Sequence, residues 1–366
     1  MGIISFPGPK SAIQIPMEMN NNQSLVDSIE QAMQNQGIRL WGAQSLQVPL
    51  TIDSYQQWLQ NSFHGEMAYL ETHLPMKQNP RAHWPDLNTA IVVAVPYLPH
   101  PKPISSLPKA LKVARYAQGE DYHFWLKEKM NKVTETLTEL LPSEKFIVFT
   151  DSGPLLERDL AQRAGLGWFG KNTCLINKTQ GSFLLIGEIL TSAMIPLTSE
   201  PSPDFCGKCT ACIDACPTQA IVAPRLLDAR KCISYLTIES KSVPPMELRK
   251  PIGDHFFGCD ICQDVCPWNR KPLNQLLSDT HQGVGQSSQE TLIQELREIL
   301  TLSGKKLQKR FMGTPLIRAG SFGLRRNALV LMGNRKLTEL KPEAEKFLRD
   351  PRLGELAAWA IEQLNL

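Results

Sequence analysis

The sequence lacks the features that mark a membrane or secreted protein. Its longest apolar runs, such as "AIVVAV" at 90–95, are far shorter than the roughly 20 residues of a transmembrane helix. The opening "MGIISFPGPK" has no basic region followed by an apolar region and a cleavage site. The net charge of +3 is too small to identify a partner by itself. We therefore expect a cytoplasmic protein with no membrane partner.

Cysteine is scarce outside one segment. Of the nine cysteines, eight lie between 206 and 266. This clustering fits reduced thiolates that hold metal in the cytosol better than it fits disulfides. The chain has 366 residues, of which 42% are hydrophobic, so we expect a globular protein with two or three domains that acts as a monomer.

Helix and strand patterns alternate in the N-terminal half. Residues 1–23 contain three prolines and an Asn/Gln run, and we predict a flexible arm there. The apolar spacing after it predicts an α/β (α+β) domain over 24–200. Its predicted elements are helices at 24–36, at 121–141 and from Pro154 to Gly165, with buried strands at 89–99, 145–150 and 182–191.

Two further regions follow this domain. A proline-rich linker at 196–204 leads into a cysteine-rich region at 201–285, which we predict to be ferredoxin-like. A polar, Gly/Ser-rich stretch at 278–289 follows. From 286 to 366 the pattern is helical, and its last two segments are compatible with degenerate HEAT-like helix pairs.

The cysteines form two related motifs. "CGKCTACIDACP" at 206–217 has gaps of two, two and three before a proline, while "CDICQDVCPW" at 259–268 lacks the first cysteine. The full spacing is that of bacterial ferredoxins, in which the fourth cysteine binds the other cluster of a pair. This rule predicts that one [4Fe–4S] cluster is bound by Cys206, Cys209, Cys212 and Cys266.

The second cluster needs a displaced ligand. Cys232 is the remaining cysteine of the region, so the predicted ligands are Cys216, Cys232, Cys259 and Cys262. The alternative is two structural zinc sites, but these do not call for this spacing with Cys-Pro at both ends. Cys174 lies outside the region and is expected to be a buried small side chain.

Two clusters imply an electron relay, and a relay needs an acceptor. "GLGWFG" at 165–170 has the wrong order relative to strand and helix for a nucleotide fingerprint. "DYHFWL" at 121–126 is similar to the cobalamin motif Asp-x-His-x-x-Gly, but Leu126 replaces the glycine. We therefore expect His123 to be a helix-start histidine rather than a cobalt ligand.

Four longer segments resemble the epoxyqueuosine reductase family, in the order in which the family carries them. They are "RYAQGEDYH" (115–123), "TDSGPLLERDLAQRAGLGWFGKNTCLI" (150–176), "LDARKCISYLTIES" (227–240) and "FGCDICQDVCPWN" (257–269). The resemblance runs from about residue 24 to the C-terminus. It implies a cobalamin-dependent iron–sulfur enzyme that reduces epoxyqueuosine at the wobble position of tRNA to queuosine, using an external low-potential electron donor.

The resemblance also implies residue roles. Asp151 matches the family's proton donor for the departing epoxide oxygen, although "DSGP" is also good helix-capping chemistry. With Asp151, the segments that line cobalamin contain Arg115, Lys171, Asn172 and Leu175, and Arg81 and Ser234 are further candidates.

Basic residues dominate one C-terminal segment. Between 301 and 336 there is no acidic residue, and the basic ones are Lys305, Lys306, Lys309, Arg310, Arg318, Arg325, Arg326, Arg335 and Lys336. Such a patch attracts phosphates, so we predict that it binds tRNA, together with Lys241. Trp268 and Phe311 are candidates for stacking on an unstacked base.

Two other functions fit parts of this pattern. A reductive dehalogenase-like enzyme would use the same cofactors on a small molecule, but the basic segment and the missing export signal argue against it. An electron carrier without chemistry of its own would not need the preceding domain. A cobalt assay and a tRNA-binding test separate the three.

Overall fold

The structure is a computed structural model that describes residues 17–100, 102, 104, 107–197, 200–279 and 288–365. Its first element is helix α1 (Met17–Asn35). Residues 17–23 of the predicted flexible arm are therefore helical, and the arm was placed too far into the chain. The rest of that predicted arm, residues 1–16, lies outside the described residues.

A four-stranded sheet forms the centre of the N-terminal half. Its order is β1 (Trp41–Ser45), β2 (Thr89–Pro96), β7 (Leu184–Thr191) and β4 (Phe146–Phe149), and every pair is antiparallel. This makes the fold α+β rather than a parallel, doubly wound α/β sheet. Residues 89–95 of β2 are buried because both faces of the central strands are covered.

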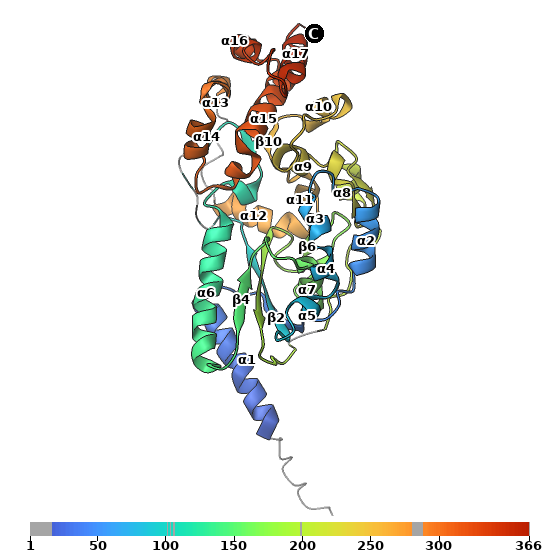
Figure 1. Cartoon of the computed structure of the whole chain (residues 1–366), viewed down its shortest axis with the longest axis vertical. Coiled ribbons are helices and arrows are strands. Elements are labelled where there is room, and N and C mark those ends of the chain that lie inside the picture. The colour runs from blue at the N-terminus through green and yellow to red at the C-terminus, as the bar shows by residue number, and fades with distance from the viewer. Residues whose placement is uncertain are drawn as a thin grey trace, which may run out of the picture.

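Helices cover the two faces of the sheet. The residues Ile91, Val93 and Val95 pack with α1 and α6 (Tyr122–Leu140), while Ala90, Val92 and Ala94 pack with α7 (Glu157–Arg163). This alternation follows from the two-residue period of a strand. Figure 1 shows α1 and α6 on one side of the sheet and α7 on the other.

Strand β4 differs from its prediction as a buried strand. It lies at the edge of the sheet, where Ile147 is 36% exposed. Predicted helix 154–165 also begins later, because α7 starts at Glu157. The short elements around the sheet are α2 (Ile52–Gln60), α3 (Tyr69–Thr72), α4 (Leu74–Gln78), α5 (Pro80–His83), β3 (Lys112–Val113), η1 (Arg115–Ala117), β5 (Trp168–Phe169) and β6 (Leu175–Ile176).

The cysteine-rich region is built from short elements. Each motif carries one helical turn, α8 (Ala211–Asp214) or α11 (Ile261–Asp264), and these two turns contact each other. The remaining elements are β8 (Ile221–Ala223), β9 (Leu226–Leu227), η2 (Ala229–Lys231), α9 (Ile233–Ile238), α10 (Met246–Ile252), β10 (His255–Phe257), η3 (Pro267–Asn269) and α12 (Arg270–Asp279). The chain thus brings the two motifs side by side.

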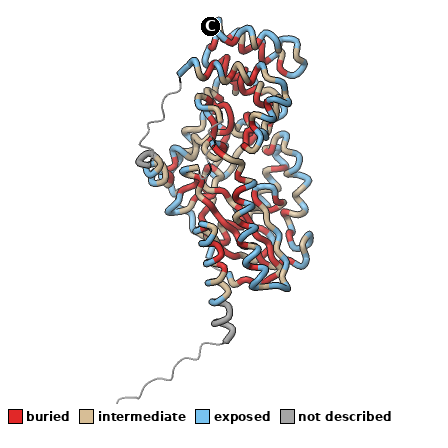
Figure 2. Tube along the Cα trace, turned by 90° about the vertical axis from the view of Figure 1, so that its left-hand side faces the viewer, coloured by how far each residue is buried: buried red, intermediate tan, exposed pale blue. Residues whose placement is uncertain are grey.

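The C-terminal region is helical and surrounds one central helix, α15 (Gly320–Arg335). Around it lie α13 (Gln289–Thr301), α14 (Gly304–Arg310), η4 (Pro315–Ala319), η5 (Thr338–Leu340), α16 (Lys341–Glu345) and α17 (Gly354–Gln363). Leu329 of α15 shares one hydrophobic core with Phe256 and Phe257 of β10. Figure 2 shows buried residues continuing from the sheet into these helices.

In the part of the chain that the structure describes, no helix is both long and apolar enough to cross a membrane.

Candidate active site

Asp151 lies in a tight loop directly after the edge strand β4. Its φ of +58° is in the left-handed region, which is unusual for a residue other than glycine. Two residues later, a Cβ on Gly153 would meet the ring of Phe149 at 2.9 Å. The side chain of Asp151 is 58% exposed. The N-cap position of α7 is occupied by Leu156, so the alternative in which Asp151 caps this helix is wrong.

The carboxyl group of Asp151 contacts the start of α6. The Tyr122 hydroxyl donates a hydrogen bond to Oδ2, and His123 Nε2 lies 3.5 Å from the same oxygen. Burial by itself raises the pKa of Asp151, but hydrogen bonds from His123 and Tyr122 bring it below its ordinary value. The positive charge of Arg318, from the C-terminal region, lowers the pKa further. In this geometry Asp151 is a carboxylate at neutral pH.

Asp121 fixes the position of His123. Its carboxyl caps α6 at the His123 backbone N–H and lies 2.7 Å from His123 Nδ1. Hydrogen bonds to Asp121 and Asp151 raise the pKa of His123 to about 9. His123 is therefore a helix-start residue, as expected from the sequence. Tyr122 was missed, because only the fold brings its hydroxyl to Asp151.

The predicted cofactor residues Lys171, Asn172 and Leu175 lie on or beside the turn between β5 and β6. Lys171 Nζ donates to the carbonyls of Gly207 at 2.7 Å and Cys209 at 2.9 Å. Asn172 is buried and its Nδ2 donates to the carbonyl of Cys262 at 3.3 Å. Leu175 is also buried. This turn therefore rests against both cysteine motifs.

The same turn also contacts the helix that follows Asp151. Arg158 of α7 donates from Nη1 to the carbonyl of Thr173 at 2.5 Å. Residues 170–174 thus contact both α7 and the cysteine motifs.

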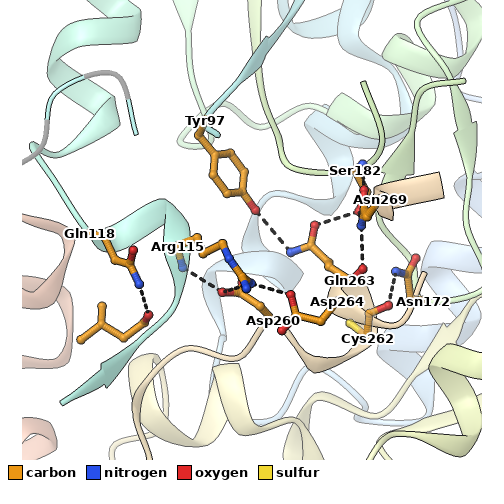
Figure 3. A network of polar contacts seen from close by, with 11 residues as sticks. Tyr97, Arg115, Gln118, Asn172, Ser182, Asp260, Cys262, Gln263, Asp264 and Asn269 are labelled. Atoms are coloured by element: carbon orange, nitrogen blue, oxygen red, sulfur yellow. Dashed lines mark hydrogen bonds and ion pairs between the residues drawn. The ribbon is translucent and has the colours of Figure 1, made fainter. Parts of the chain in front are cut away.

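The other predicted cofactor residues are placed differently. Arg115 forms ion pairs with Asp260 at 3.3 Å and Asp264 at 2.5 Å, so it braces the second cysteine motif (Figure 3). Arg81 donates to Asn88 Oδ1 at 3.1 Å. The Ser234 hydroxyl interacts with the Cys232 thiol.

A buried polar network holds the second motif against the sheet domain. Gln263 bonds the Tyr97 hydroxyl at 3.3 Å and accepts from Ser182 at 2.9 Å. Asn269 donates to Ser182 Oγ at 2.9 Å and to the Gln263 carbonyl at 2.7 Å. Figure 3 shows this network next to the Arg115 ion pairs and the Asn172–Cys262 contact. The network fixes the cysteines relative to the sheet.

The structure gathers eight cysteines into two sets. In the first set, burial and then the neighbouring Cys266, Cys206 and Cys209 together raise the pKa of the Cys212 thiol to about 11. Trp168 Nε1 donates to Cys206 Sγ at 3.4 Å. These four cysteines are those that the crossover rule assigned to one cluster.

The second set contains the displaced cysteine. Burial, followed by the effects of Cys232, Asp260 and Cys216, raises the pKa of the Cys259 thiol to about 12. A hydrogen bond with Cys174 and then burial raise the pKa of Cys262, with Cys232 and Cys259 adding to the shift. The set therefore includes the four predicted ligands, with the ninth cysteine beside them.

The donor chemistry fits two iron–sulfur clusters. Each set offers four thiols, and Trp168 and Ile176 pack against the first. Within the described ranges, no three His, Cys, Asp or Glu side chains are close enough to hold a single metal ion.

Most of the predicted tRNA-binding side chains are exposed, but Arg310 and Arg325 are only partly exposed and Arg326 is buried. Lys305, Lys306 and Lys309 on α14 are exposed, as is Lys241. Arg310 pairs with Glu298 at 3.2 Å and Arg318 with Glu239 at 3.0 Å. Arg335 and Lys336, at the end of the basic segment, are also exposed.

Arg326 was wrongly assigned to the tRNA surface. It is 0% exposed because other elements pack around α15 at this position. Its guanidinium donates hydrogen bonds to the carbonyls of Ser240 and Ser242. Arg325 is half-buried and donates to the Leu302 carbonyl at 2.8 Å. Phe311, one of the two predicted stacking residues, is 1% exposed and belongs to the core.

Comparison with known proteins decides the family. Residues 77–152 match a family model described as "Epoxyqueuosine reductase QueG, DUF1730", and residues 205–269 match a "4Fe-4S double cluster binding domain". A curated epoxyqueuosine reductase of Escherichia coli (strain K12) is 37% identical over 95% of this chain and 91% of its own length. The chain belongs to the epoxyqueuosine reductase family. Another epoxyqueuosine reductase, from Pseudomonas aeruginosa, is 38% identical over 84% of this chain and 86% of its own length.

Solved epoxyqueuosine reductases share the fold. One was crystallised with an epoxyqueuosine-modified tRNA-Tyr stem loop; it is 28% identical, covers 93% of this chain and 90% of its own chain, and has a TM-score of 0.77. The Bacillus subtilis epoxyqueuosine reductase was solved with its catalytic aspartate loop swung out of the active site; it has 28% identity, the same coverage and a TM-score of 0.75.

Proposed function

We propose that the protein reduces epoxyqueuosine at the wobble position of tRNA to queuosine. Membership of the epoxyqueuosine reductase family carries this proposal. The position of the exposed Asp151 supports it, because the 170–174 turn contacts both the cysteine motifs and α7, the helix that follows the Asp151 loop. Its family makes the enzyme an oxidoreductase, and we expect Asp151 to lie close to its redox groups.

The two cysteine sets would hold two [4Fe–4S] clusters. Cys206, Cys209, Cys212 and Cys266 would bind the first, and Cys216, Cys232, Cys259 and Cys262 the second. Support comes from the match to a double-cluster domain and from the mutual effects of these thiols on their pKa values. The electrons would come from an external low-potential donor.

Cobalamin is the proposed second cofactor. When bound, it supplies low-valent cobalt, a strong nucleophile and reductant. The residues Lys171, Asn172 and Leu175 would hold it. Their turn fits this role because it touches the cysteine motifs through Lys171 and Asn172 and the Asp151 side through Arg158. Arg115 would act through Asp260 and Asp264 of the second cysteine motif, and Ser234 through the Cys232 thiol that it contacts. Arg81 is a further candidate for the cobalamin site.

Asp151 would donate a proton to the epoxide oxygen. An alkoxide is a poor leaving group, so the C–O bond breaks more easily when the oxygen is protonated. Tyr122 and His123 would orient the carboxyl group through their contacts with Oδ2. The exposure of Asp151 leaves it accessible to a base that is turned out of the anticodon.

The tRNA would lie along the exposed basic residues. Lys305, Lys306, Lys309 and Lys241 are free to approach phosphates. Arg318 links this surface to the acid, because its charge already acts on Asp151. Phosphate contacts of this kind position the RNA, and the modified base would enter the site next to Asp151.

One experiment tests the proposal. Protein with both clusters and cobalamin is incubated anaerobically with tRNA carrying epoxyqueuosine and a low-potential reductant, and the nucleosides are analysed by mass spectrometry. We expect a cobalamin-dependent loss of one oxygen atom. An unchanged nucleoside from fully loaded protein would refute the proposal and favour a small-molecule reductase.

A further inference from the structure

Three buried ionisable side chains lie around the base of the Asp151 loop. Glu188 of β7 is 0% exposed, and neither of its carboxyl oxygens has a hydrogen-bond partner among the described residues. The buried Oε1 of Glu157, on α7, likewise has no partner in that part of the chain. Lys77 of α4 is 6% exposed and donates to the Leu155 carbonyl at 2.6 Å. None of these residues has a role in the reaction described above.

Packing does not explain Glu188. Its neighbours on the same face of β7 are Ile186 and Leu190, which pack in the apolar layer beneath α7. An aliphatic residue would fill this position without an unpaired carboxyl group. Buried polar groups without partners are costly and rare, and buried ionisable clusters beside a cleft are typical of functional sites.

The cluster surrounds the base of the Asp151 loop. Glu188 is paired in register with Phe149, two residues before Asp151. The Asp151 backbone hydrogen-bonds to the carboxyl group of Glu157. Lys77 holds the other end of the loop at Leu155. Glu157 is thus the buried acid that touches the loop directly.

Glu157 holds a proton at neutral pH. Burial, and after it the negative charge of Asp151, raise its pKa to about 8, although the charges of Lys77 and Arg158 and the hydrogen bond from the Asp151 backbone oppose the shift. Burial also raises the pKa of Glu188 well above its ordinary value, and Glu157 and Asp151 add to that shift. The groups that face Glu157 are therefore Asp151, Glu188, Lys77 and Arg158, with Tyr122 on the far side of Asp151.

The proposed reaction needs more protons than Asp151 can hold. An epoxide, two electrons and two protons give an alkene and water, but one carboxyl group carries at most one proton. Tyr122 and His123 also favour the ionised form of Asp151. A proton source close to Asp151 is therefore required in every turnover.

We propose that Glu157 supplies protons to Asp151 during epoxide reduction, an inference that rests on the proposed function. The O–H bond of the Glu157 carboxyl breaks and an O–H bond forms on the Asp151 carboxylate. Glu157 is left as a carboxylate near Lys77 and regains its proton from solvent. The two electrons come from the reductant that the reaction already needs. Glu157 acts through Asp151, so it is a positioning residue rather than a catalytic one.

The test compares three variants of the loaded enzyme. Glu157→Gln keeps the size and hydrogen bonding of the side chain but removes its titration. Glu157→Asp keeps the titration and serves as the rescue variant. Glu139→Gln changes an exposed acid on α6 and is the matched control. Cluster and cobalamin contents, measured by visible absorption, show that each variant is folded.

The first readout needs no tRNA. Infrared difference spectra across a pH titration should show a protonated carboxylic acid that ionises near pH 8, the value for Glu157. This band should persist in Glu139→Gln and be absent in Glu157→Gln. If the band persists in Glu157→Gln as it does in Glu139→Gln, the proposal is wrong, because another group then carries the proton.

The second readout is the pH dependence of epoxyqueuosine reduction. The wild-type rate should fall as the pH rises above about 8, since the protonated form of Glu157 is the active one. In Glu157→Gln the decrease near pH 8 should disappear, which leaves only the titration of His123 near pH 9, and the rate at pH 7 should fall about tenfold or more. Glu157→Asp should keep the decrease near pH 8. If the wild-type enzyme is active and Glu157→Gln has the same rate and the same pH profile, only this inference is refuted. A loaded wild-type enzyme that leaves the substrate unchanged would instead refute the proposed function.

Discussion

The hydrogen bond from Tyr122 to Asp151 leads to a quantitative prediction. Tyr122→Phe removes the donor but keeps the ring, which stacks on His123 with the centroids 4.2 Å apart. A hydrogen bond to a charged group contributes about 1.5–3 kcal/mol. Because the Asp151 side chain is 58% exposed, solvent screening reduces this to roughly 1–1.5 kcal/mol. At about 1.4 kcal/mol per pH unit, the pKa of Asp151 should rise by roughly one unit.

The sign of this effect is fixed by the direction of the shift. The pKa of Asp151 is lowered in the folded protein, so the contacts of its carboxylate stabilise the fold at neutral pH and are lost as the pH falls. Tyr122→Phe should make the protein slightly less stable at neutral pH, with a smaller difference at acidic pH. It should also increase the protonated fraction of Asp151 at pH 7.

Carbon-13 NMR of aspartate-labelled protein measures this pKa, and Asp151→Asn identifies the signal. Tyr116→Phe is the control: Tyr116 lies edge-on to Tyr122 at 6.0 Å, but within the described residues its hydroxyl forms no hydrogen bond with Asp151. A pKa that stays unchanged or falls in Tyr122→Phe would show that the hydroxyl does not stabilise the carboxylate.

Further predictions concern the acid, the clusters, the RNA surface and the core. Asp151→Ala should abolish turnover while both clusters and cobalamin stay bound, as judged by mass spectrometry and absorption. Cys232→Ala should lose about half of the protein-bound iron, since it removes one ligand of one cluster. Replacing both Lys305 and Lys309 by Ala should weaken tRNA binding and reduce the salt dependence of the affinity by about one to two released counterions. Asn327→Ala should destabilise the fold by about 2–4 kcal/mol in denaturant unfolding, because two buried carbonyls lose their donor.

The predictions for the acid, the clusters and the RNA surface can each be contradicted by one result. Full activity in Asp151→Ala would remove its assignment as the acid, and unchanged iron in Cys232→Ala would refute the displaced-ligand assignment. A salt dependence equal to that of wild type would place the RNA away from α14. Exposed Lys132→Ala on α6 is a suitable control for the lysine variants.

Local sequence patterns were sufficient for the long elements and for the grouping of the cysteines. The apolar spacing located α6 and the central strand β2 to within a few residues. The ferredoxin spacing rule led to the two sets of thiols that the fold brings together, because each motif is a short loop whose geometry depends on few residues.

Tertiary packing determined what the sequence could not show. Arg325 and Arg326 are adjacent and have the same charge, but α15 is enclosed by other helices and buries the second. The partnership of Tyr122 with Asp151 joins the start of one helix to the end of a distant strand. The antiparallel order β1-β2-β7-β4 likewise depends on long-range pairing, which periodicity does not encode.

The shared core around α15 limits how the protein can be divided. Leu329 packs against β10, and Asn327 donates a hydrogen bond to it. Strand β10 leads directly into the second cysteine motif. A chain shortened before α13 would leave Phe256 and Phe257 uncovered, and we expect it to aggregate. The basic surface is therefore not a detachable RNA-binding module. We therefore expect that the cysteine motifs and the basic surface can be exchanged between proteins, by recombination or by engineering, only as a single unit.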